Sequence, residues 1–236
     1  MIDLHTHILC GMDDGARDAE MSLQMLKAEQ AQGVDTVVLT PHYYRHRESV
    51  REFLRRRQEA VERLERHLER LSSEERAELP KTVLGAEVAW VPNLADCEDL
   101  DKLCLNGTKY LLLELPYGKW DHALVDQVYN LMTKTGLTPV LAHLDRYRGM
   151  QPPQQIRKIL ELELPMQINS SMFLHLISRG YGIRALQQYA HVVASDCHDC
   201  SHRPPNLRDA MQVIEKKLGR EAAVVIDANA RLFAGL

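Results

Sequence analysis

Histidine and carboxylate side chains recur at the ends of short apolar segments in this chain of 236 residues. His5 and His7 lie two positions apart in the first segment, residues 2–7. Side chains at positions i and i+2 of a strand point to the same face, so both imidazoles can reach one ion. The later apolar segments end on side chains of the same kinds: His42, Glu87, Glu114, His143 and Asp196, with His198 two positions further on.

Charged and imidazole groups at strand ends are costly to bury unless each has a partner. One such group would be interpreted as a cap or a satisfied core residue, but a whole set at equivalent strand ends favours a polynuclear metal site. Imidazole and carboxylate ligands without thiolates fit Mn, Fe or Zn better than a cysteine-rich structural zinc site or an all-oxygen calcium site.

A second carboxylate source follows the first segment, in Asp13-Asp14-Gly15. Asp-Gly is a strong turn signal, and a turn is the plain interpretation of this tripeptide. It also places a carboxylate just above the strand ends, within reach of the ions. The residue types alone do not choose between Asp13 and Asp14.

Two arginines follow the ligand-type residues closely along the chain. Arg146 comes three positions after His143, and Arg203 comes five after His198. Each could form an ordinary surface ion pair, but the guanidinium group also offers a planar fork to a phosphate. Their placement on the loops that carry the ligand-type residues favours phosphate clamps.

A cysteine-based alternative rests on Cys197 and Arg203, whose spacing matches the signature of the thiolate-dependent tyrosine phosphatases. Such a loop wraps an anion with backbone N–H groups at a helix N-terminus. Here it holds Asp199 and no glycine, and a thiolate mechanism leaves the other strand-end ligands without a role. The lone C-x-x-C of residues 197–200 is weak support for a zinc or redox site.

Seven short, nearly continuous apolar segments are typical of parallel strands buried on both faces. They alternate with helical patterns, which predicts an α/β fold, and polar residues at equivalent strand ends predict a barrel. No linker or repeat interrupts residues 1–236, so we expect a single domain. The expected strands are 2–7, 36–42, 82–87, 110–114, 139–143, 165–169 and 192–196, and the expected helices are 18–33, 48–72, 121–135, 152–163 and 205–218.

The bulk composition is that of an ordinary globular protein, with 45% hydrophobic and 26% charged residues and a formal net charge of -4. This balance argues against a nucleic-acid or membrane partner. The arginine-rich stretch 55–57 lies among glutamates of the same predicted helix and is interpreted as a solvated face with ion pairs four positions apart. The first residues lack the pattern of a signal peptide, and five cysteines fit reduced thiols, so we expect a cytoplasmic protein.

These residues form ordered motifs that resemble the polymerase-and-histidinol-phosphatase (PHP) superfamily. The resemblance is strongest to the bacterial manganese-dependent tyrosine-protein phosphatases of capsule and exopolysaccharide loci, and it spans nearly the whole chain. The motifs that carry it are 2–9 with 12–16, 40–42, 85–87, 113–114, 142–147, 194–198 and 203–205.

The resemblance implies a distorted (β/α)₇ barrel with three divalent ions, most simply Mn²⁺, with Fe or Zn as alternatives. It implies one ion held by His5, His7, Glu87 and Asp196, a second by Glu87, Glu114 and His143, and a third by Asp14, His42 and His198. It therefore favours Asp14 over Asp13. Three such ions would outweigh the four carboxylates by two positive charges, which suits a dianionic phosphate monoester.

The expected activity is hydrolysis of a phosphate monoester, with phosphotyrosine on a partner protein, such as a bacterial tyrosine autokinase, as the expected substrate. The alternatives are a small-molecule phosphatase of the histidinol-phosphate type and a non-catalytic metal-binding regulator of polysaccharide export. A proofreading nuclease is disfavoured by the acidic chain. The sequence leaves the oligomeric state undefined.

Overall fold

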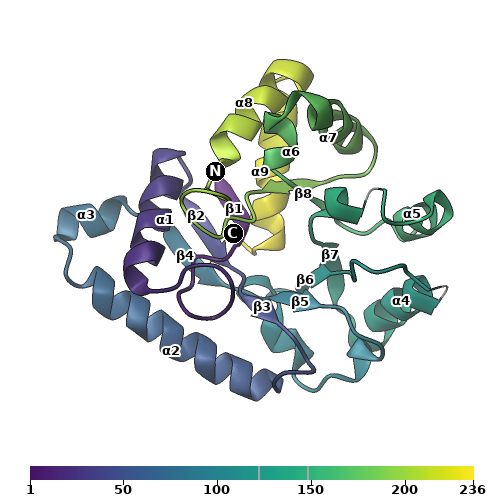
Figure 1. The fold of residues 1–236 in the computed structure, drawn as a ribbon, viewed down its shortest axis with the longest axis horizontal. Helices are drawn as coiled ribbons and strands as arrows, with labels where there is room; N and C mark the ends of the chain where they lie inside the picture. Colours follow the sequence, from purple (N-terminus) through teal and green to yellow (C-terminus); the bar gives the residue numbers. More distant parts are fainter. Residues whose placement is uncertain (122, 148) are drawn as a thin grey trace.

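Short parallel strands alternate with helices throughout the computed structural model, which describes residues 1–121, 123–147 and 149–236 (Figure 1). The strands are β1 (Ile2–Thr6), β2 (Thr36–Leu39), β3 (His42–Tyr43), β4 (Lys81–Leu84), β5 (Glu87–Ala89), β6 (Tyr110–Glu114), β7 (Thr138–Leu141), β8 (Gln167–Asn169) and β9 (Val192–Ala194). The α-helices are α1 (Ala19–Ala31), α2 (Val50–Leu68), α3 (Ser73–Glu78), α4 (Ala123–Thr135), α5 (Pro153–Leu160), α6 (Ser171–Leu174), α7 (Leu176–Gln188), α8 (Leu207–Leu218) and α9 (Arg220–Phe233). Short 3₁₀ turns are η1 (Leu94–Asp96), η2 (Leu100–Leu103), η3 (Leu105–Gly107) and η4 (Leu144–Tyr147).

The strands close into a ring in the order of the chain. Hydrogen-bonded ladders give the sheets β1-β2-β4, β3-β5-β6-β7 and β8-β9, all parallel. Single bridges join the sheets, one between Leu141 and Met166 and one between Thr6 and Cys197. Because β2 and β3, like β4 and β5, are successive parts of one expected strand, the predicted seven-stranded (β/α) barrel is confirmed.

The barrel is distorted where two of its strands are interrupted. The break between β2 and β3 contains Pro41, which has no N–H to donate to a ladder. Its carbonyl still accepts from the Glu87 N–H at 3.1 Å, so the neighbouring strand stays in register beyond the break. In this way His42 and Glu87, which are direct partners in the β3–β5 ladder, come to lie side by side.

Helix boundaries follow local capping. The Asp18 carboxylate accepts from the Met21 N–H at 2.8 Å where α1 begins, and Gly33 has a φ of 74° just after the helix ends. Ser49 and Glu52 form a capping box at the start of α2. The predicted helices 18–33 and 48–72 thus correspond to α1 and α2, with α2 ending four residues earlier at Leu68.

Three further predicted helices are present and four others were not anticipated. Residues 121–135, 152–163 and 205–218 contain α4, α5 and α8, although position 122 lies outside the described residues. The helices α3, α6, α7 and α9 were missed. The last of these packs beneath β1, where the Asp227 carboxylate accepts from the Ile2 N–H at 2.8 Å.

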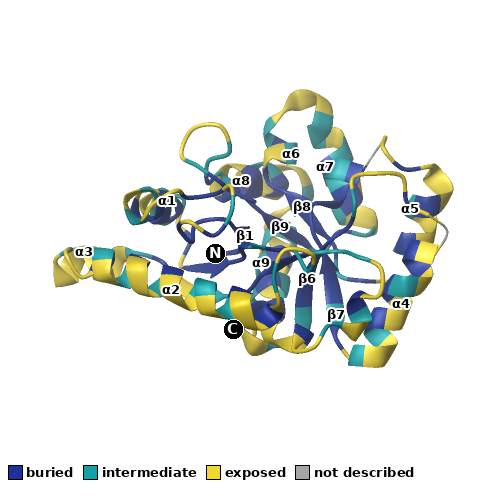
Figure 2. Cartoon of the chain, turned by 60° about the horizontal axis from the view of Figure 1, so that its bottom comes forward, coloured by how far each residue is buried: buried dark blue, intermediate teal, exposed yellow. Residues whose placement is uncertain are grey.

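Two apolar clusters hold the barrel together. One contains side chains from β1, β2, β6, β7 and β9, strands on opposite sides of the ring, so this cluster fills the barrel interior. Ala230 and Phe233 of α9 belong to the same cluster. The other cluster lies between the strands and the surrounding helices, whose outer faces are exposed (Figure 2). Within the described ranges, none of the helices combines the length and the apolar character needed to cross a membrane.

Candidate metal centre

Two imidazoles and two carboxylates converge at the end of β1. The Nε2 atoms of His5 and His7 are 3.1 Å apart. Glu87 Oε2 lies 3.2 and 3.3 Å from these two nitrogens, and Asp196 Oδ1 lies 3.5 and 3.4 Å from them. All four side chains are buried. The expectation that His5 and His7 share one face therefore holds in the structure, and their lone pairs point at a common position.

Asp13 fixes the orientation of His7. Its Oδ2 lies 2.7 Å from His7 Nδ1 and also accepts from the His42 N–H at 2.9 Å. A carboxylate that accepts here requires the proton of His7 on Nδ1, which leaves Nε2 free to bind a cation. Burial would raise the pKa of Asp13, but His7 outweighs it and lowers the pKa to about 2.

The turn that carries Asp13 must be closed by glycine. The Gly15 N–H donates to Asp13 Oδ1 at 3.0 Å. A Cβ atom at Gly15 would lie only 2.1 Å from the His7 carbonyl oxygen, so the turn could not approach β1 with any other residue there.

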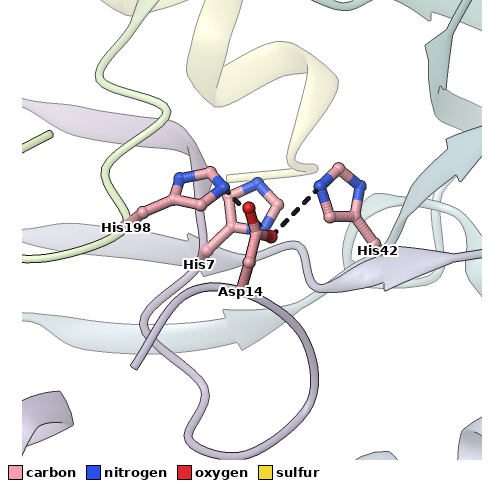
Figure 3. Close-up of side chains that lie close together, drawn as sticks. All are labelled: His7, Asp14, His42 and His198. Carbon is pink, nitrogen blue, oxygen red and sulfur yellow. Dashed lines mark ion pairs between the residues drawn. The ribbon is translucent and has the colours of Figure 1, made fainter. Parts of the chain in front are cut away.

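Asp14 lies on the outer side of the same turn. Its side chain is 68% exposed, yet its Oδ1 lies 3.6 Å from His42 Nε2 and 3.5 Å from His198 Nε2. Figure 3 shows the carboxylate between these two imidazoles, beside His7. One ligand atom from each of these four residues fits within a 4.8 Å group, so Asp14 faces the cluster and Asp13 supports it.

Glu87 stands between two parts of the site. Its Oε1 lies 2.8 Å from His143 Nε2, whereas its Oε2 faces His5 and His7 and lies 2.9 Å from His42 Nδ1. Glu114 joins the same region, with Oε1 3.4 Å from His143 Nε2. Each oxygen of Glu87 thus serves a different set of nitrogens, which is the geometry of a bridging carboxylate.

The carboxylates of the centre favour positive charge on three of its imidazoles, whereas burial and the nearby charge of His7 lower the pKa of His198 to about 4. Burial alone would lower the pKa of the imidazoles, but the nearby carboxylates raise the pKa of His7, His42 and His143, the last to about 9. Burial would raise the pKa of the Glu87 and Asp196 carboxyls, but the surrounding imidazoles hold both pKa values well below the usual range. Both carboxylates are therefore anionic at neutral pH.

Several buried atoms of the centre have no hydrogen-bond partner among the described residues. They include Glu87 Oε2 and His42 Nδ1, which lie 2.9 Å apart but not in hydrogen-bond geometry, and His198 Nε2, whose neighbour Asp14 Oδ1 is 3.5 Å away. A buried polar atom left unsatisfied costs about 1–3 kcal/mol. Each of these atoms has a lone pair that a cation can satisfy, so the donor set fits divalent metal ions.

Backbone strain is concentrated at the same strand ends. His143 and Asp196, each two positions after the end of β7 or β9, have φ values of 31° and 54°, in the left-handed region that residues other than glycine rarely adopt. Such conformations cost about 1–3 kcal/mol each and persist where the surroundings enforce them. Here the strained backbone turns both side chains toward the cluster.

The two predicted clamp residues lie together at the edge of the centre. Arg146 and Arg203 both form ion pairs with Asp196 Oδ2, and the Arg203 nitrogen lies 2.7 Å away. Arg146 also donates to the Tyr117 hydroxyl at 2.8 Å, and the Tyr117 ring is nearly parallel to the His143 ring. Both guanidinium groups are partly exposed, so a phosphate entering from solvent can reach them.

Cys197 points away from this cluster. Its thiol is fully buried and lies 3.6 Å from Glu29 Oε1 on α1. Burial, together with the negative charges of Glu29 and Asp3, raises the pKa of the thiol well above its ordinary value. A neutral, inaccessible thiol is a poor nucleophile, so the cysteine-based alternative loses its main requirement.

Sequence reasoning overlooked three polar side chains that support the site. Tyr117 follows β6 in a loop without a recognisable motif. Gln167 and Asn169 lie on β8, where the strand was expected but no role was assigned to its residues. Burial was expected for the residues of this apolar strand, and a buried amide needs hydrogen-bond partners. This was the signal that could have pointed to Gln167 and Asn169.

Two hollows border the centre. One, of about 510 Å³, is lined by Asp14, His42, Tyr44 and Arg47 among others. The other, of about 540 Å³, lies on the far side of Asp14 and includes His198 in its lining. The exposed carboxylate of Asp14 therefore stands between two openings from which a substrate can approach.

Known proteins resemble this chain over most of its length. The family model described as "Capsular polysaccharide synthesis, CpsB/CapC" matches residues 1–232. Tyrosine-protein phosphatase YwqE of Bacillus subtilis (strain 168) is 31% identical over 245 residues, covering 98% of this chain and 91% of YwqE. Tyrosine-protein phosphatase CpsB of Streptococcus agalactiae serotype V is 29% identical, covering 94% of this chain and 93% of that protein.

A solved structure is similar to the whole barrel. Crystal structures of YwqE from Bacillus subtilis and CpsB from Streptococcus pneumoniae are described as those of unique metal-dependent tyrosine phosphatases. The match has a TM-score of 0.81 and 29% sequence identity, and it covers 100% of this chain and 94% of the matched chain.

Proposed function

The chain belongs to the CpsB/CapC family of capsular polysaccharide synthesis, and we infer from this that it is a metal-dependent tyrosine-protein phosphatase. The observation that carries the inference within this molecule is the convergence of buried imidazole and carboxylate atoms around Glu87, several of them without a hydrogen-bond partner among the described residues. A structural core has no need for such an arrangement, whereas a polynuclear metal centre depends on it.

We propose that three divalent ions occupy this centre. His5, His7, Glu87 and Asp196 would hold the first, Glu87, Glu114 and His143 the second, and Asp14, His42 and His198 the third. The close groups of ligand atoms support the first and third sets, while Glu114 lies near both His42 and His143. Imidazole and carboxylate donors suit Mn²⁺, which we propose as the native metal, with Fe or Zn as alternatives.

The bound ions would supply Lewis acidity and a water of lowered pKa, and with it a nucleophile for hydrolysis near neutral pH. The protein itself orients the metal ligands and supplies positive charge for the phosphate. Asp13 holds the His7 imidazole with Nε2 directed at the centre. Arg146 and Arg203 would leave Asp196 in part to bind the oxygens of the phosphate and stabilise the charge that develops on them.

The substrate we propose is a phosphotyrosyl side chain of a partner protein, most simply a bacterial tyrosine autokinase of the capsule system. The two hollows that share Asp14 in their lining are where we propose that the phosphotyrosyl side chain enters. We further propose that residues 1–236 act as one PHP-type domain in the cytoplasm without a nucleic-acid partner. Packing of α9 against both β1 and β9 supports a single unit.

The experiment that tests this function combines metal analysis with a substrate panel. Purified protein is analysed for metal content and then assayed with a phosphotyrosyl peptide, histidinol phosphate and a phosphodiester. We expect more than one transition-metal equivalent per chain and a clear preference for the phosphotyrosyl peptide. Preference for histidinol phosphate would indicate that the protein is a small-molecule phosphatase with the same metal centre. Bound metal without hydrolysis of any monoester would favour a non-catalytic metal-binding protein.

A further inference from the structure

β8 contributes none of the proposed metal ligands, yet it directs two polar side chains into the buried region beside them. Gln167 and Asn169 are two positions apart on this strand, and both are at least 95% buried. Each is bonded to residues of other strands. A buried amide must satisfy a carbonyl oxygen and an amino group with different partners, so the direction of each hydrogen bond can be worked out.

The orientation of Gln167 is fixed by the backbone. The His143 N–H, which can only donate, lies 2.6 Å from Gln167 Oε1. The same Oε1 lies 3.3 Å from His5 Nδ1. Because this oxygen can only accept, the hydrogen bond requires a proton on Nδ1 of His5. The lone pair of His5 is then on Nε2, the atom that faces His7, Glu87 and Asp196.

The same logic continues to Asp196. The amino group of Gln167 donates to Asn169 Oδ1 at 2.8 Å, which fixes the Asn169 amide in turn. Asn169 Nδ2 then donates to Asp196 Oδ2 at 2.9 Å. Asp196 Oδ2 is thus engaged by Asn169 and the two arginines, while Oδ1 is left facing the imidazoles of His5 and His7.

We propose that Gln167 and Asn169 form an amide relay whose function is to position two metal ligands. The relay sets the tautomer of His5 and assigns the two oxygens of Asp196 to different tasks, one to the metal and one to the arginines. It therefore couples the first proposed metal position to the phosphate clamp. This inference rests on the proposed metal centre but adds two residues of a strand that supplies no ligand to it.

The size of the effect follows from the known cost of losing a partner behind a metal ligand, which is about 10–100-fold in metal affinity or activity. Gln167→Leu removes both halves of the relay at similar volume. Gln167→Glu keeps an oxygen that accepts from His5 and from the His143 N–H but cannot donate to Asn169. Comparison of the two variants separates the effect of the acceptor, which Gln167→Glu restores together with a negative charge, from the effect of the donor to Asn169, which both variants lack.

Gln151 provides a matched control. It is also buried, accepts from the Trp120 N–H at 2.9 Å and donates to the Gly118 carbonyl at 2.8 Å. Gln151→Leu therefore removes a comparable pair of hydrogen bonds from a part of the barrel that carries no proposed ligand. We expect it to reduce thermal stability by about as much as Gln167→Leu without changing metal affinity.

The measurement is Mn²⁺ affinity by competition with a chromophoric chelator, with thermal unfolding of each variant recorded alongside. We expect affinity to fall about 10–100-fold in Gln167→Leu, to recover most of the way in Gln167→Glu and to be unchanged in Gln151→Leu. Unchanged affinity in Gln167→Leu, or equal losses in all three variants, would overturn the relay. Failure of the wild-type protein to bind Mn²⁺, Fe²⁺ or Zn²⁺ would instead refute the metal centre itself.

Discussion

The two ends of the barrel differ in how their charged groups are satisfied. At the carboxyl ends of the strands, imidazoles and carboxylates are buried together, and several of their atoms have no hydrogen-bond partner among the described residues. At the amino ends, a larger hollow of about 650 Å³ lies among Met1, Gly33, α8 and α9. There Arg231 forms ion pairs with Asp227 at 3.0 Å and with Asp35 at 2.6 Å.

This difference shows that the volume of a hollow is a poor guide to its function in this molecule. Three arginines line the larger hollow, and the charge of one of them, Arg231, is already balanced by Asp35 and Asp227, so this charge adds little demand for a ligand. The smaller hollows adjoin the ligand-type residues Asp14, His42 and His198. Two further residues of the same cluster, His143 and Asp196, are held on strained backbone. We therefore expect changes at the carboxyl end to alter activity, and changes at the amino end to alter only stability.

Removal of metal should have the largest effect. Excess chelator should abolish hydrolysis of a phosphotyrosyl peptide, because the nucleophile and most of the positive charge are lost together. Addition of Mn²⁺ after removal of the chelator should restore activity. Metal content must be measured on the same sample, and full turnover after verified metal loss would show that the carboxyl end is not a metal centre.

Glu87→Gln should have the next largest effect. The amide cannot supply two anionic oxygens, and the variant loses the carboxylate that faces His5, His7, His42 and His143. Since loss of a supporting residue already costs about 10–100-fold, loss of a bridging ligand, the role that we propose for Glu87, should lower metal affinity and activity by more than about 100-fold. Circular dichroism should show a folded barrel. Near-normal turnover would mean that Glu87 is not a bridging ligand.

Arg146→Ala and Arg203→Ala should separate phosphate binding from metal binding. Each removes a charged donor from the edge of the centre and leaves every proposed ligand in place. Loss of one preorganised donor lowers kcat by about 10²–10³-fold, and we expect reductions of this order with metal content unchanged. Steady-state kinetics and metal analysis give the result. Loss of metal from either variant would make that arginine a structural partner of Asp196.

The fold could be predicted wherever local sequence was decisive. Buried parallel strands need continuous apolar segments, and these are short and distinct along the chain. Helices with a clear capping residue or a row of apolar residues along one face, such as α1 and α2, were also predicted. By contrast, α7 contains Gly180 and Gly182 and has few buried positions, while α9 is held by its contacts with β1 and β9. Such contacts connect residues far apart in sequence, and a local pattern does not contain them.

The position of the ligand-type residues could be predicted from the strand pattern, but the residues that support them could not. Parallel strands bring their carboxyl ends together, so ligand-type residues at those ends had to meet. The choice between Asp13 and Asp14 depended on the path of one turn, which places the first behind His7 and the second between His42 and His198. Gln167 and Asn169 remained unrecognised, because their role depends on partners from other strands.

Cys197→Ser tests how sharply the functional end is bounded. The residue is adjacent to Asp196, but its thiol faces Glu29 on the opposite side of the strand end. Burial and the nearby carboxylates raise the pKa of the thiol, so it stays neutral and takes no part in hydrolysis. Activity should remain within a few-fold of wild type, and alkylating agents should inhibit slowly. Complete loss of turnover with metal retained, together with a trapped phosphocysteine, would restore the thiolate mechanism.

Arg231→Ala should have the smallest effect, and one confined to stability. Burial would raise the pKa of Asp35, but the hydrogen bond from Arg231 outweighs it and holds the pKa below its usual value near 3.8. Because the folded-state pKa is lowered, the stabilisation is complete above about pH 4 and is lost as the pH falls through the folded-state value. Both side chains are partly exposed, so the free energy of unfolding at pH 7 should decrease by about 1 kcal/mol or less.

The measurement is urea unfolding of wild type, Arg231→Ala, Asp35→Asn and the double variant at pH 7 and at pH 3. The double-mutant cycle isolates the pair, and its coupling energy should be smaller at pH 3 because Asp35, in the variant that lacks Arg231 to lower its pKa, is then partly protonated. Phosphatase activity at pH 7 should equal that of wild type in all four proteins. A fall in activity comparable to that of Arg146→Ala would show that the amino end communicates with the metal centre, and the contrast between the two ends would no longer hold.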